Sequence, residues 1–340
     1  MTDPTPLRPI DTVAVLGAGA WGTALALVAA RAGRTVRLWS RDPETVAEIG
    51  EQGTNAAFLG DIRLDPGLFA TTDAAAALAG ADMVILAVPA QVTREVAREF
   101  AALVPKGIPV VSAAKGLEHG THATMTRVIA EELPATIPAV LSGPSFATDV
   151  ARRLPTAVTV GADDDAVAAA ICRALSSSSF RPYASHDLVG VEIGGALKNV
   201  LAIASGIVAG RGLGASAQAA LTARGFAELS RLARALGAEP ETLMGLSGLG
   251  DLVLTATSPQ SRNFSLGMSL GAGGSVADLT RRGTKLAEGV HTAAVAVEFA
   301  ALHGVELPIT AAIADVISEK IDVAGAIDRL MSRPLKRETA

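Results

Sequence analysis

A chain of 340 residues is long enough to form two domains with substantial hydrophobic cores. About half of it is apolar (49%) but only 3% is aromatic, a composition that favours closely packed helices over an aromatic-rich sandwich. The formal net charge of −5 and the dispersed lysines and arginines argue against a broad nucleic-acid-binding surface. The single cysteine, Cys172, excludes an internal disulfide, and we expect it to be a buried small hydrophobic side chain.

The N-terminus is expected to be a flexible tail over residues 1–10, because Pro4, Pro6 and Pro9 interrupt it and no apolar signal region is present. Two apolar stretches are poor candidates for membrane spans. Residues 18–30 are too few to cross a bilayer, and residues 193–210 include Lys198 and several glycines. We therefore expect a soluble, cytoplasmic protein without membrane insertion.

Short β-branched runs alternate with helical patterns from residue 11 to about residue 185. An alanine-rich helix is expected at 22–32, and strands are expected at 12–16, 35–39, 83–88, 109–113, 139–142 and 157–160. This alternation predicts a parallel sheet covered by helices on both faces, which is the doubly wound, Rossmann-like α/β arrangement.

The strand signals fade after the serines at 176–179 and Pro182. Beyond them the chain is read as helices with glycine-rich interruptions at 206–214, 245–250 and 271–274. The sequence thus predicts an N-terminal α/β domain at 11–185 and a C-terminal all-α domain at 186–332, followed by a tail at 333–340.

The segment Gly17-Ala-Gly19-Ala-Trp-Gly22 follows the first expected strand and opens the first helix, as a dinucleotide-binding turn requires. Gly17 permits the tight turn, Gly19 lets the backbone approach a pyrophosphate, and Gly22 lets helix and strand pack closely. The N–H groups at the helix start would then face the phosphates. We predict a dinucleotide cofactor, and the alternative is a purely structural glycine turn.

The choice of cofactor should show at the end of the second strand, where an acid would bind the ribose of NAD. This chain has Ser40 at that place, followed by Arg41 and Asp42. Arg41 suits a 2′-phosphate, so NADP(H) is favoured, with NAD(H) also accepted. Asp42 could still reach a ribose, but it would also be a good N-cap for a helix beginning at Pro43.

Lys198 and Asn199 stand side by side in an otherwise apolar helical run. An interior lysine costs free energy unless something compensates, so its presence suggests an enzyme that moves a hydride and handles a proton beside it. Lys115 follows the expected strand at 109–113 and is read either as a ligand contact or as a solvated loop lysine. Ser145, in a Gly-Pro turn, could line a pocket or only cap a loop.

Asp251 is a single acid among small and apolar residues. The run Ser261-Arg262-Asn263 places a hydroxyl, a guanidinium and an amide in succession, and such a trio can grip a phosphate. The alternative for Arg262 is a solvated loop arginine. Residues 285–289 are less distinctive and read as a helix end with a charged pair.

These blocks, in this order, resemble the bacterial-type NAD(P)-dependent sn-glycerol-3-phosphate dehydrogenases over about residues 11–330. The matching blocks are GAGAWGTALA (17–26), AAKGLE (113–118), SGPSFA (142–147), GVEIGGALKNVLAIASGI (190–207), GLGDLVLT (248–255) and SPQSRN (258–263). The resemblance implies an oxidoreductase that reversibly reduces dihydroxyacetone phosphate to sn-glycerol 3-phosphate with NAD(P)H and supplies glycerophospholipid synthesis.

The resemblance also implies that Lys198 is the catalytic acid/base and that no metal takes part. The substrate contacts that it implies are Lys115, Gly143, Ser145, Lys198, Asn199, Asp251, Ser261, Arg262 and Asn263. The cofactor contacts that it implies are Gly17, Gly19, Ala20, Trp21, Gly22, Arg41, Lys115, Ala147, Arg262, Leu286 and Glu288. For Lys198 we expect burial and the charge of Lys115 to lower the pKa, and Asp251 to raise it.

The chain departs from the family pattern at Ser216, Thr222, Ala223 and Gly60. Two other functions remain open on the residues alone. One is a β-hydroxyacid dehydrogenase, in which the lysine and asparagine are usually a helical turn apart, and the other is a non-catalytic redox sensor that binds NADP(H). The expected partner is a small phosphorylated substrate and not a nucleic acid, and alanine- and glycine-rich helices would also suit a homodimer.

Overall fold

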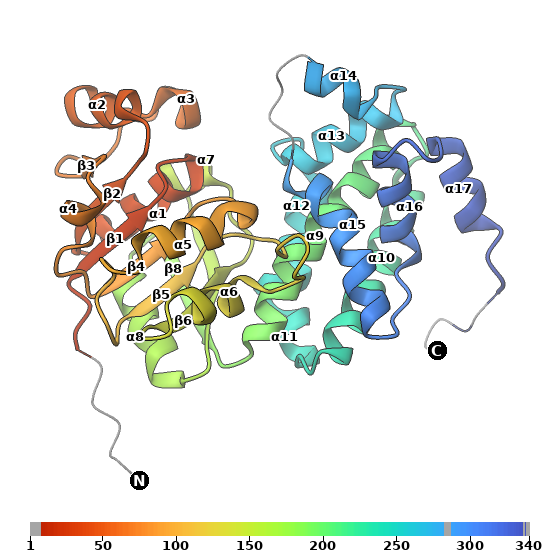
Figure 1. The fold of residues 1–340 in the computed structure, drawn as a ribbon. Helices are drawn as coiled ribbons and strands as arrows, with labels where there is room; N and C mark the ends of the chain where they lie inside the picture. Colours follow the sequence, from red (N-terminus) through yellow and green to blue (C-terminus); the bar gives the residue numbers. More distant parts are fainter. Residues whose placement is uncertain (1–7, 282–286, 336, 338–340) are drawn as a thin grey trace, which may run out of the picture.

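The computed structural model describes residues 8–281, 287–335 and 337. Its N-terminal half is built on an eight-stranded sheet in the order β3-β2-β1-β4-β5-β6-β7-β8 (Figure 1). The strands are β1 (Thr12–Leu16), β2 (Thr35–Trp39), β3 (Phe69–Thr71), β4 (Met83–Leu86), β5 (Pro109–Ser112), β6 (Ile137–Ser142), β7 (Thr156–Ala162) and β8 (Phe180–Ser185). The predicted Rossmann-like sheet is therefore confirmed, together with all six strands expected from the sequence.

The prediction of an all-parallel sheet is wrong at one place, because β6 and β7 pair antiparallel. The only helix between them is α7 (Ala147–Ala151), whose 5 residues rise by about 7.5 Å. That is too short to carry the chain back along β6, which is about 20 Å long. The longer α8 (Asp165–Leu175) then returns the chain, and β7 and β8 pair parallel again.

Two strands were not predicted. β3 is only 3 residues long and joins the sheet beside β2. β8 contains Pro182, which pairs opposite Val158 on β7. Proline cannot donate to a sheet ladder, and β8 tolerates it because it is an edge strand.

Helices cover both faces of the sheet, and successive side chains of β1 point alternately into the two hydrophobic cores that result. Val13 and Val15 face a core that includes side chains of α1 (Ala20–Arg31) and α8. Ala14 and Leu16 face the opposite core, which is formed with α4 (Ala74–Leu78), α5 (Thr93–Phe100) and α6 (Met125–Glu132). The remaining N-terminal helices are α2 (Pro43–Gln52), α3 (Ala56–Leu59) and the short 3₁₀ turn Ala90–Val92. In α8, Cys172 is partly buried, and burial raises the pKa of its thiol to about 11.

The C-terminal half is helical, as predicted, and is arranged around α9 (Leu188–Gly210) (Figure 1). By length and composition α9 could cross a membrane, but 89% of its apolar window is buried inside the protein. It is therefore the core helix of this half. Around and beyond it lie α10 (Ala215–Ala235), α11 (Pro240–Met244), a π-helical turn (Leu246–Gly250), α12 (Asp251–Thr257), α13 (Arg262–Gly271), α14 (Val276–Arg281), α15 (Glu288–Leu302), α16 (Pro308–Ile317) and α17 (Val323–Met331).

The glycines of α9 do not interrupt it as the sequence suggested. Gly206 lies inside the helix where α13 crosses it, and a Cβ there would lie 2.1 Å from the Phe264 carbonyl oxygen. Gly267 on α13 is its counterpart, because a Cβ on it would lie 2.1 Å from the Ile203 carbonyl oxygen. The two backbones are thus in direct contact, and this contact fixes the position of α13, which begins at Arg262.

Candidate active site

Lys198 is buried at the point where α9 meets both the sheet and the π-helical turn. Gly194 and Gly195, one turn earlier, allow this approach. A Cβ on Gly194 would lie 2.8 Å from the Ser247 carbonyl oxygen, and one on Gly195 would lie 2.6 Å from the Ser142 hydroxyl. The short residues that precede Lys198 therefore bring its side chain to the carboxyl edge of the sheet, because Ser142 is the last residue of β6.

The Lys198 ammonium has two partners on α12. Its Nζ donates to Oδ1 of Asp251 at 2.5 Å and to Oγ1 of Thr255 at 2.8 Å. Asp251 is almost completely buried, with 1% of its surface exposed. Sequence reasoning missed Thr255 as a site residue, although it stands four residues after Asp251 and so lies on the same helical face.

Lys115 reaches the same carboxylate from the sheet. Its Nζ donates to Oδ2 of Asp251 at 2.7 Å and to the Gly143 carbonyl oxygen at 2.9 Å. Only 13% of its side chain is exposed, so the alternative of a solvated loop lysine is wrong. Asp251 thus joins one ammonium group from each half of the molecule.

This arrangement sets the protonation of Lys198. Burial lowers the pKa of Lys198 to about 8, the carboxylate of Asp251 opposes that shift, and the charge of Lys115 adds to it. All three directions are those predicted from the sequence. Burial also raises the pKa of Glu288, against the effect of the nearby cations Arg262, Lys115 and Lys198.

The turn after β6 brings Gly143 and Ser145 next to Lys115. Gly143 has a φ of +140°, and a Cβ on it would lie 2.9 Å from the Val158 Cα, so only glycine suits this position. Its carbonyl oxygen accepts from both Lys115 and the Ser145 hydroxyl, the latter at 3.0 Å. The hydroxyl hydrogen of Ser145 is therefore bonded within the turn, and the lone pairs of its oxygen remain available to a ligand.

Two asparagines connect this loop to the helices. The Asn199 amide donates to the Lys115 carbonyl oxygen at 3.3 Å, and its Oδ1 accepts from Nδ2 of Asn263 at 3.0 Å. Oδ1 of Asn263 in turn accepts from the Gly289 N–H at 3.0 Å. The chain of bonds runs from the sheet edge through α9 and α13 to α15.

The three residues expected to bind a phosphate, Ser261, Arg262 and Asn263, are therefore not equally available to a ligand. Ser261 is buried and caps α13 by accepting from the Phe264 N–H at 3.3 Å. Asn263 is buried, with one of its amide hydrogens and its oxygen already bonded. Arg262 alone is exposed, at the first position of α13. Of these three side chains, only the Arg262 guanidinium has no hydrogen bond to another group in the described part of the chain.

The turn from β1 to α1 fits a dinucleotide. Gly17 has a φ of +113°, and a Cβ on Gly22 would lie 1.8 Å from the Gly17 carbonyl oxygen, so turn and helix are closely packed. At Gly19, by contrast, an added Cβ would meet nothing within 4 Å. No side chain caps α1, so its first N–H groups are free for an anion. Trp21 has a buried Nε1 without a partner among the described residues.

At the end of β2 the alternative for Asp42 is confirmed, because it caps α2. Its carboxylate accepts from the Glu44 N–H at 3.1 Å and from the Thr45 N–H at 3.3 Å. The hydroxyl of Ser40 accepts from the Asp42 N–H, and Arg41 is exposed beside them. The remaining cofactor candidates Ala20, Ala147 and Glu288 are partly buried at the starts of α1, α7 and α15, and Leu286 lies outside the described residues.

The four residues that depart from the family pattern take no part in the hydrogen bonds of Lys115 and Lys198. Ser216, Thr222 and Ala223 are on α10, where the Thr222 hydroxyl donates to the Gln218 carbonyl oxygen. Gly60 ends α3 with a φ of +64°, which a proline, fixed near −65°, could not adopt.

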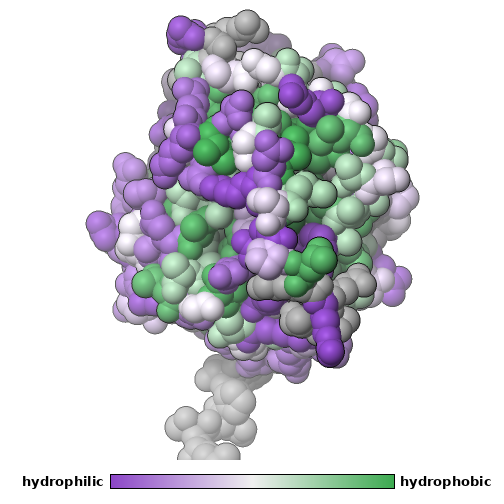
Figure 2. Space-filling view, turned by 90° about the vertical axis from the view of Figure 1, so that its right-hand side faces the viewer, coloured by the Kyte–Doolittle hydropathy of each residue, from purple (hydrophilic) through white to green (hydrophobic). Residues whose placement is uncertain are grey.

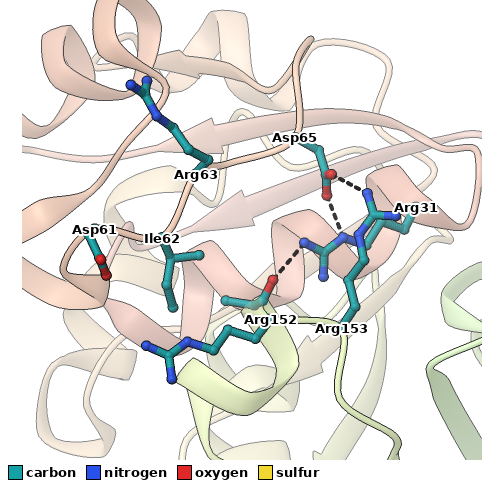
Figure 3. A pocket seen from close by; sticks show the side chains of 8 residues that line it. Arg31, Asp61, Ile62, Arg63, Asp65, Arg152 and Arg153 are labelled. Carbon is teal, nitrogen blue, oxygen red and sulfur yellow. Dashed lines mark hydrogen bonds and ion pairs between the residues drawn. The ribbon is translucent and has the colours of Figure 1, made fainter.

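A cavity of about 390 Å³ lies on the N-terminal half, away from these residues (Figure 3). It contains Asp65, which pairs with Arg31 and Arg153. Arg31 also donates to the carbonyl oxygens of Val150 and Ala151 at 2.9 and 2.8 Å. These bonds tie the loop before β3 to α1 and α7, so the cluster has a structural role. A second cavity, of about 550 Å³, is lined by residues 155–157 and 176–181, also outside the lysine site.

The chain is similar to known proteins along almost its whole length. The family model described as NAD-dependent glycerol-3-phosphate dehydrogenase N-terminus matches residues 12–168, and the corresponding C-terminus model matches residues 187–328. A glycerol-3-phosphate dehydrogenase [NAD(P)+] of Azorhizobium caulinodans is 59% identical over 98% of this chain and 100% of its own. One from Rhodopseudomonas palustris is 55% identical over the same shares.

Solved structures show the same architecture. The crystal structure of glycerol-3-phosphate dehydrogenase from Coxiella burnetii superimposes with a TM-score of 0.90 and 38% identity, covering 96% of this chain and 100% of that one. A ketopantoate reductase family protein from Ralstonia eutropha has a TM-score of 0.59 at 18% identity, over 94% of this chain and 99% of its own, which is a likeness of fold alone.

Proposed function

The chain belongs to the NAD-dependent glycerol-3-phosphate dehydrogenase family, and from this we infer that it reversibly reduces dihydroxyacetone phosphate to sn-glycerol 3-phosphate with NAD(P)H. The product supplies glycerophospholipid synthesis. The observation that carries the assignment is the buried Lys198–Asp251–Lys115 cluster at the carboxyl edge of the sheet, where ligands bind in such folds.

Lys198 is the proposed acid/base. The nicotinamide, when bound, supplies the hydride for the carbonyl carbon. The Lys198 ammonium would stabilise the negative charge that develops on the carbonyl oxygen and then donate a proton to it. Asp251 and Thr255 hold the ammonium in place for this role. In the reverse direction neutral Lys198 would accept the proton of the substrate hydroxyl.

The substrate phosphate is proposed to bind Arg262. This exposed guanidinium stands at the N-terminus of α13, where the partial positive charge of the helix favours an anion although Ser261 caps the Phe264 N–H. Asn263 contributes its remaining amide hydrogen and, with Asn199, keeps α13 in register with the Lys115 loop. Binding energy from the phosphate would then orient the carbonyl group beside Lys198. Lys115, Gly143, Ser145 and Ser261 complete the proposed substrate-binding set.

The cofactor is proposed to lie over the turn Gly17–Gly22, with the other contacts at Ala147, Glu288 and Leu286. A preference for NADP(H) is inferred from Arg41, because the nearby carboxylate of Asp42 is engaged in capping α2. The boundary between the cofactor and substrate domains is proposed at residues 185 and 186, between the end of β8 and the start of α9.

A cytoplasmic enzyme that forms a homodimer through its helical half is also proposed. Apolar side chains gather in patches on the face of that half shown in Figure 2. The exposed apolar residues of the helical half include Met244, Val253, Leu302 and Met331. Burial of such side chains against a second copy would remove them from water.

One assay tests the proposed reaction. Oxidation of NADPH and of NADH is followed with dihydroxyacetone phosphate and, as a matched control, with unphosphorylated dihydroxyacetone. Turnover is expected with the phosphorylated ketone only. Equal kcat/KM values for the two ketones would remove the phosphate from recognition, and cofactor binding without turnover would point to a redox sensor instead.

A further inference from the structure

Asn55 is a completely buried asparagine that contacts the cofactor turn from a distant part of the chain. It stands between α2 and α3 and has 0% of its surface exposed. Its Nδ2 donates to the Ala18 carbonyl oxygen and to Oγ1 of Thr23, both at 2.9 Å. Ala18 lies inside the Gly17–Gly22 turn and Thr23 in the first turn of α1, so one side chain spans the bend.

The bond to Ala18 determines which way the following peptide group faces. A trans peptide is planar, with its C=O and N–H pointing in opposite directions. Because Asn55, together with the Thr23 hydroxyl at 3.3 Å, holds the Ala18 carbonyl toward the interior, the N–H of Gly19 must point away from it. An added Cβ on Gly19 would meet nothing within 4 Å, so there is open space beside this residue. Among the described residues no backbone carbonyl accepts from the Gly19 N–H.

Asn55 is itself held on both sides. Oε1 of Glu48, on α2, accepts from the Thr54 hydroxyl and from the Ala56 N–H, each at 2.7 Å. The two residues that flank Asn55 are thus fixed to α2, the helix that begins directly after Arg41 and Asp42. The same element therefore connects the proposed 2′-phosphate end of the cofactor site to the turn.

A purely structural role explains this side chain poorly. Its Oδ1 is buried and has no hydrogen-bond partner in the described part of the chain. A buried acceptor without a partner costs free energy, which an apolar residue of similar size would avoid. The amide is useful at this place for its two donors, and both are directed at the turn.

We propose that Asn55 is a positioning residue for the dinucleotide, which holds the Ala18 carbonyl inward and so turns the Gly19 N–H toward the pyrophosphate. The inference rests on the proposed function, because it requires a dinucleotide on this turn. It also makes the loop after α2 part of the cofactor site, although Asn55 itself is completely buried.

The test compares Asn55→Asp, which keeps the shape but loses both donors, with the parent enzyme. Calorimetric titration should show the Kd for NADPH rising by about tenfold or more, the effect of a lost hydrogen bond to a charged group. The Kd for 2′-AMP, which carries the adenosine end without the pyrophosphate, should change by less than about threefold. At saturating NADPH the KM for dihydroxyacetone phosphate should stay unchanged.

Two further variants keep the test decisive. Thr23→Val preserves the buried shape at 0% exposure and removes two bonds that hold the turn, the one from the Asn55 amide and the one from the Thr23 hydroxyl to the Ala18 carbonyl. It should therefore weaken NADPH binding in the same direction even if Asn55→Asp does not fold. Thr310→Val, which loses a buried hydrogen bond to Glu228 in the helical half, is the matched control and should lower Tm without changing the Kd for NADPH.

Parent-like NADPH binding in both turn variants would overturn the proposal, as would an equal loss of 2′-AMP and NADPH affinity. If the parent enzyme itself binds no NADPH, the proposed function fails and not this inference alone.

Discussion

The pH dependence of the two reaction directions follows from the burial of Lys198. Burial lowers its pKa from 10.5 to about 8. At pH 7 an amine with a pKa of 10.5 is neutral in about one molecule in 3,000, whereas one with a pKa of 8 is neutral in about one in 11. The folded environment therefore raises the fraction of usable base by about 300-fold at neutral pH.

Oxidation of glycerol 3-phosphate needs neutral Lys198, so its kcat/KM should rise tenfold per pH unit and level off above about pH 8. Reduction of dihydroxyacetone phosphate needs the ammonium, so its kcat/KM should fall above the same pH. The measurement is initial NADPH formation or consumption at 340 nm between about pH 6 and 10 in buffers of constant ionic strength.

Two variants shift this inflection in opposite directions. Lys115→Met removes a like charge and should move it to higher pH, whereas Asp251→Asn removes the compensating carboxylate and should move it to lower pH. Coincident optima for oxidation and reduction, or an inflection that neither variant moves, would refute the assignment of Lys198 as the proton-transferring group.

Three other predictions concern phosphate binding, cofactor choice and stability. Arg262→Ala should raise the KM for dihydroxyacetone phosphate by about 100-fold and change kcat much less, and an unchanged KM would remove it from the phosphate site. Arg41→Ala should raise the KM for NADPH by about tenfold and that for NADH by less than twofold, whereas equal losses would exclude a 2′-phosphate contact. Gly206→Ala places a Cβ 2.1 Å from the Phe264 carbonyl oxygen and should lower stability in a thermal melt by about 1–3 kcal/mol. Gly50→Ala, in α2 with open space around it, is the control and should not lower Tm.

The sequence predicted most of the sheet and the identity of the central residues. Strand alternation and the Gly17–Gly22 turn are local signals, since they depend on neighbours a few residues apart. Lys198 was also recognisable, because a charged residue in an apolar helix is unusual wherever the helix lies. These predictions needed only periodicity and the cost of burying charge.

Contacts between distant segments were not predictable in the same way. Gly206 was read as a break because glycine weakens helices, but in the fold its missing Cβ admits α13. Asn263 was assigned to a ligand phosphate, yet its amide bonds Asn199 and Gly289, which lie 64 and 26 residues away. Asn55 carries no motif of its own, and its role appears only when α2 is folded beside the turn.

The shared carboxylate of Asp251 connects the fold to the chemistry. Its two oxygens hold Lys198 at 2.5 Å and Lys115 at 2.7 Å, so one buried negative charge faces two positive ones. Lys115, Asp251 and Lys198 together therefore carry one excess positive charge in a largely buried cluster, and a neutral ketone does little to balance it. The alkoxide that forms during reduction does balance it, because its negative charge arises beside the ammonium of Lys198. The excess charge thus stabilises the transition state more than the bound ketone, which is the condition for faster catalysis and not only tighter binding.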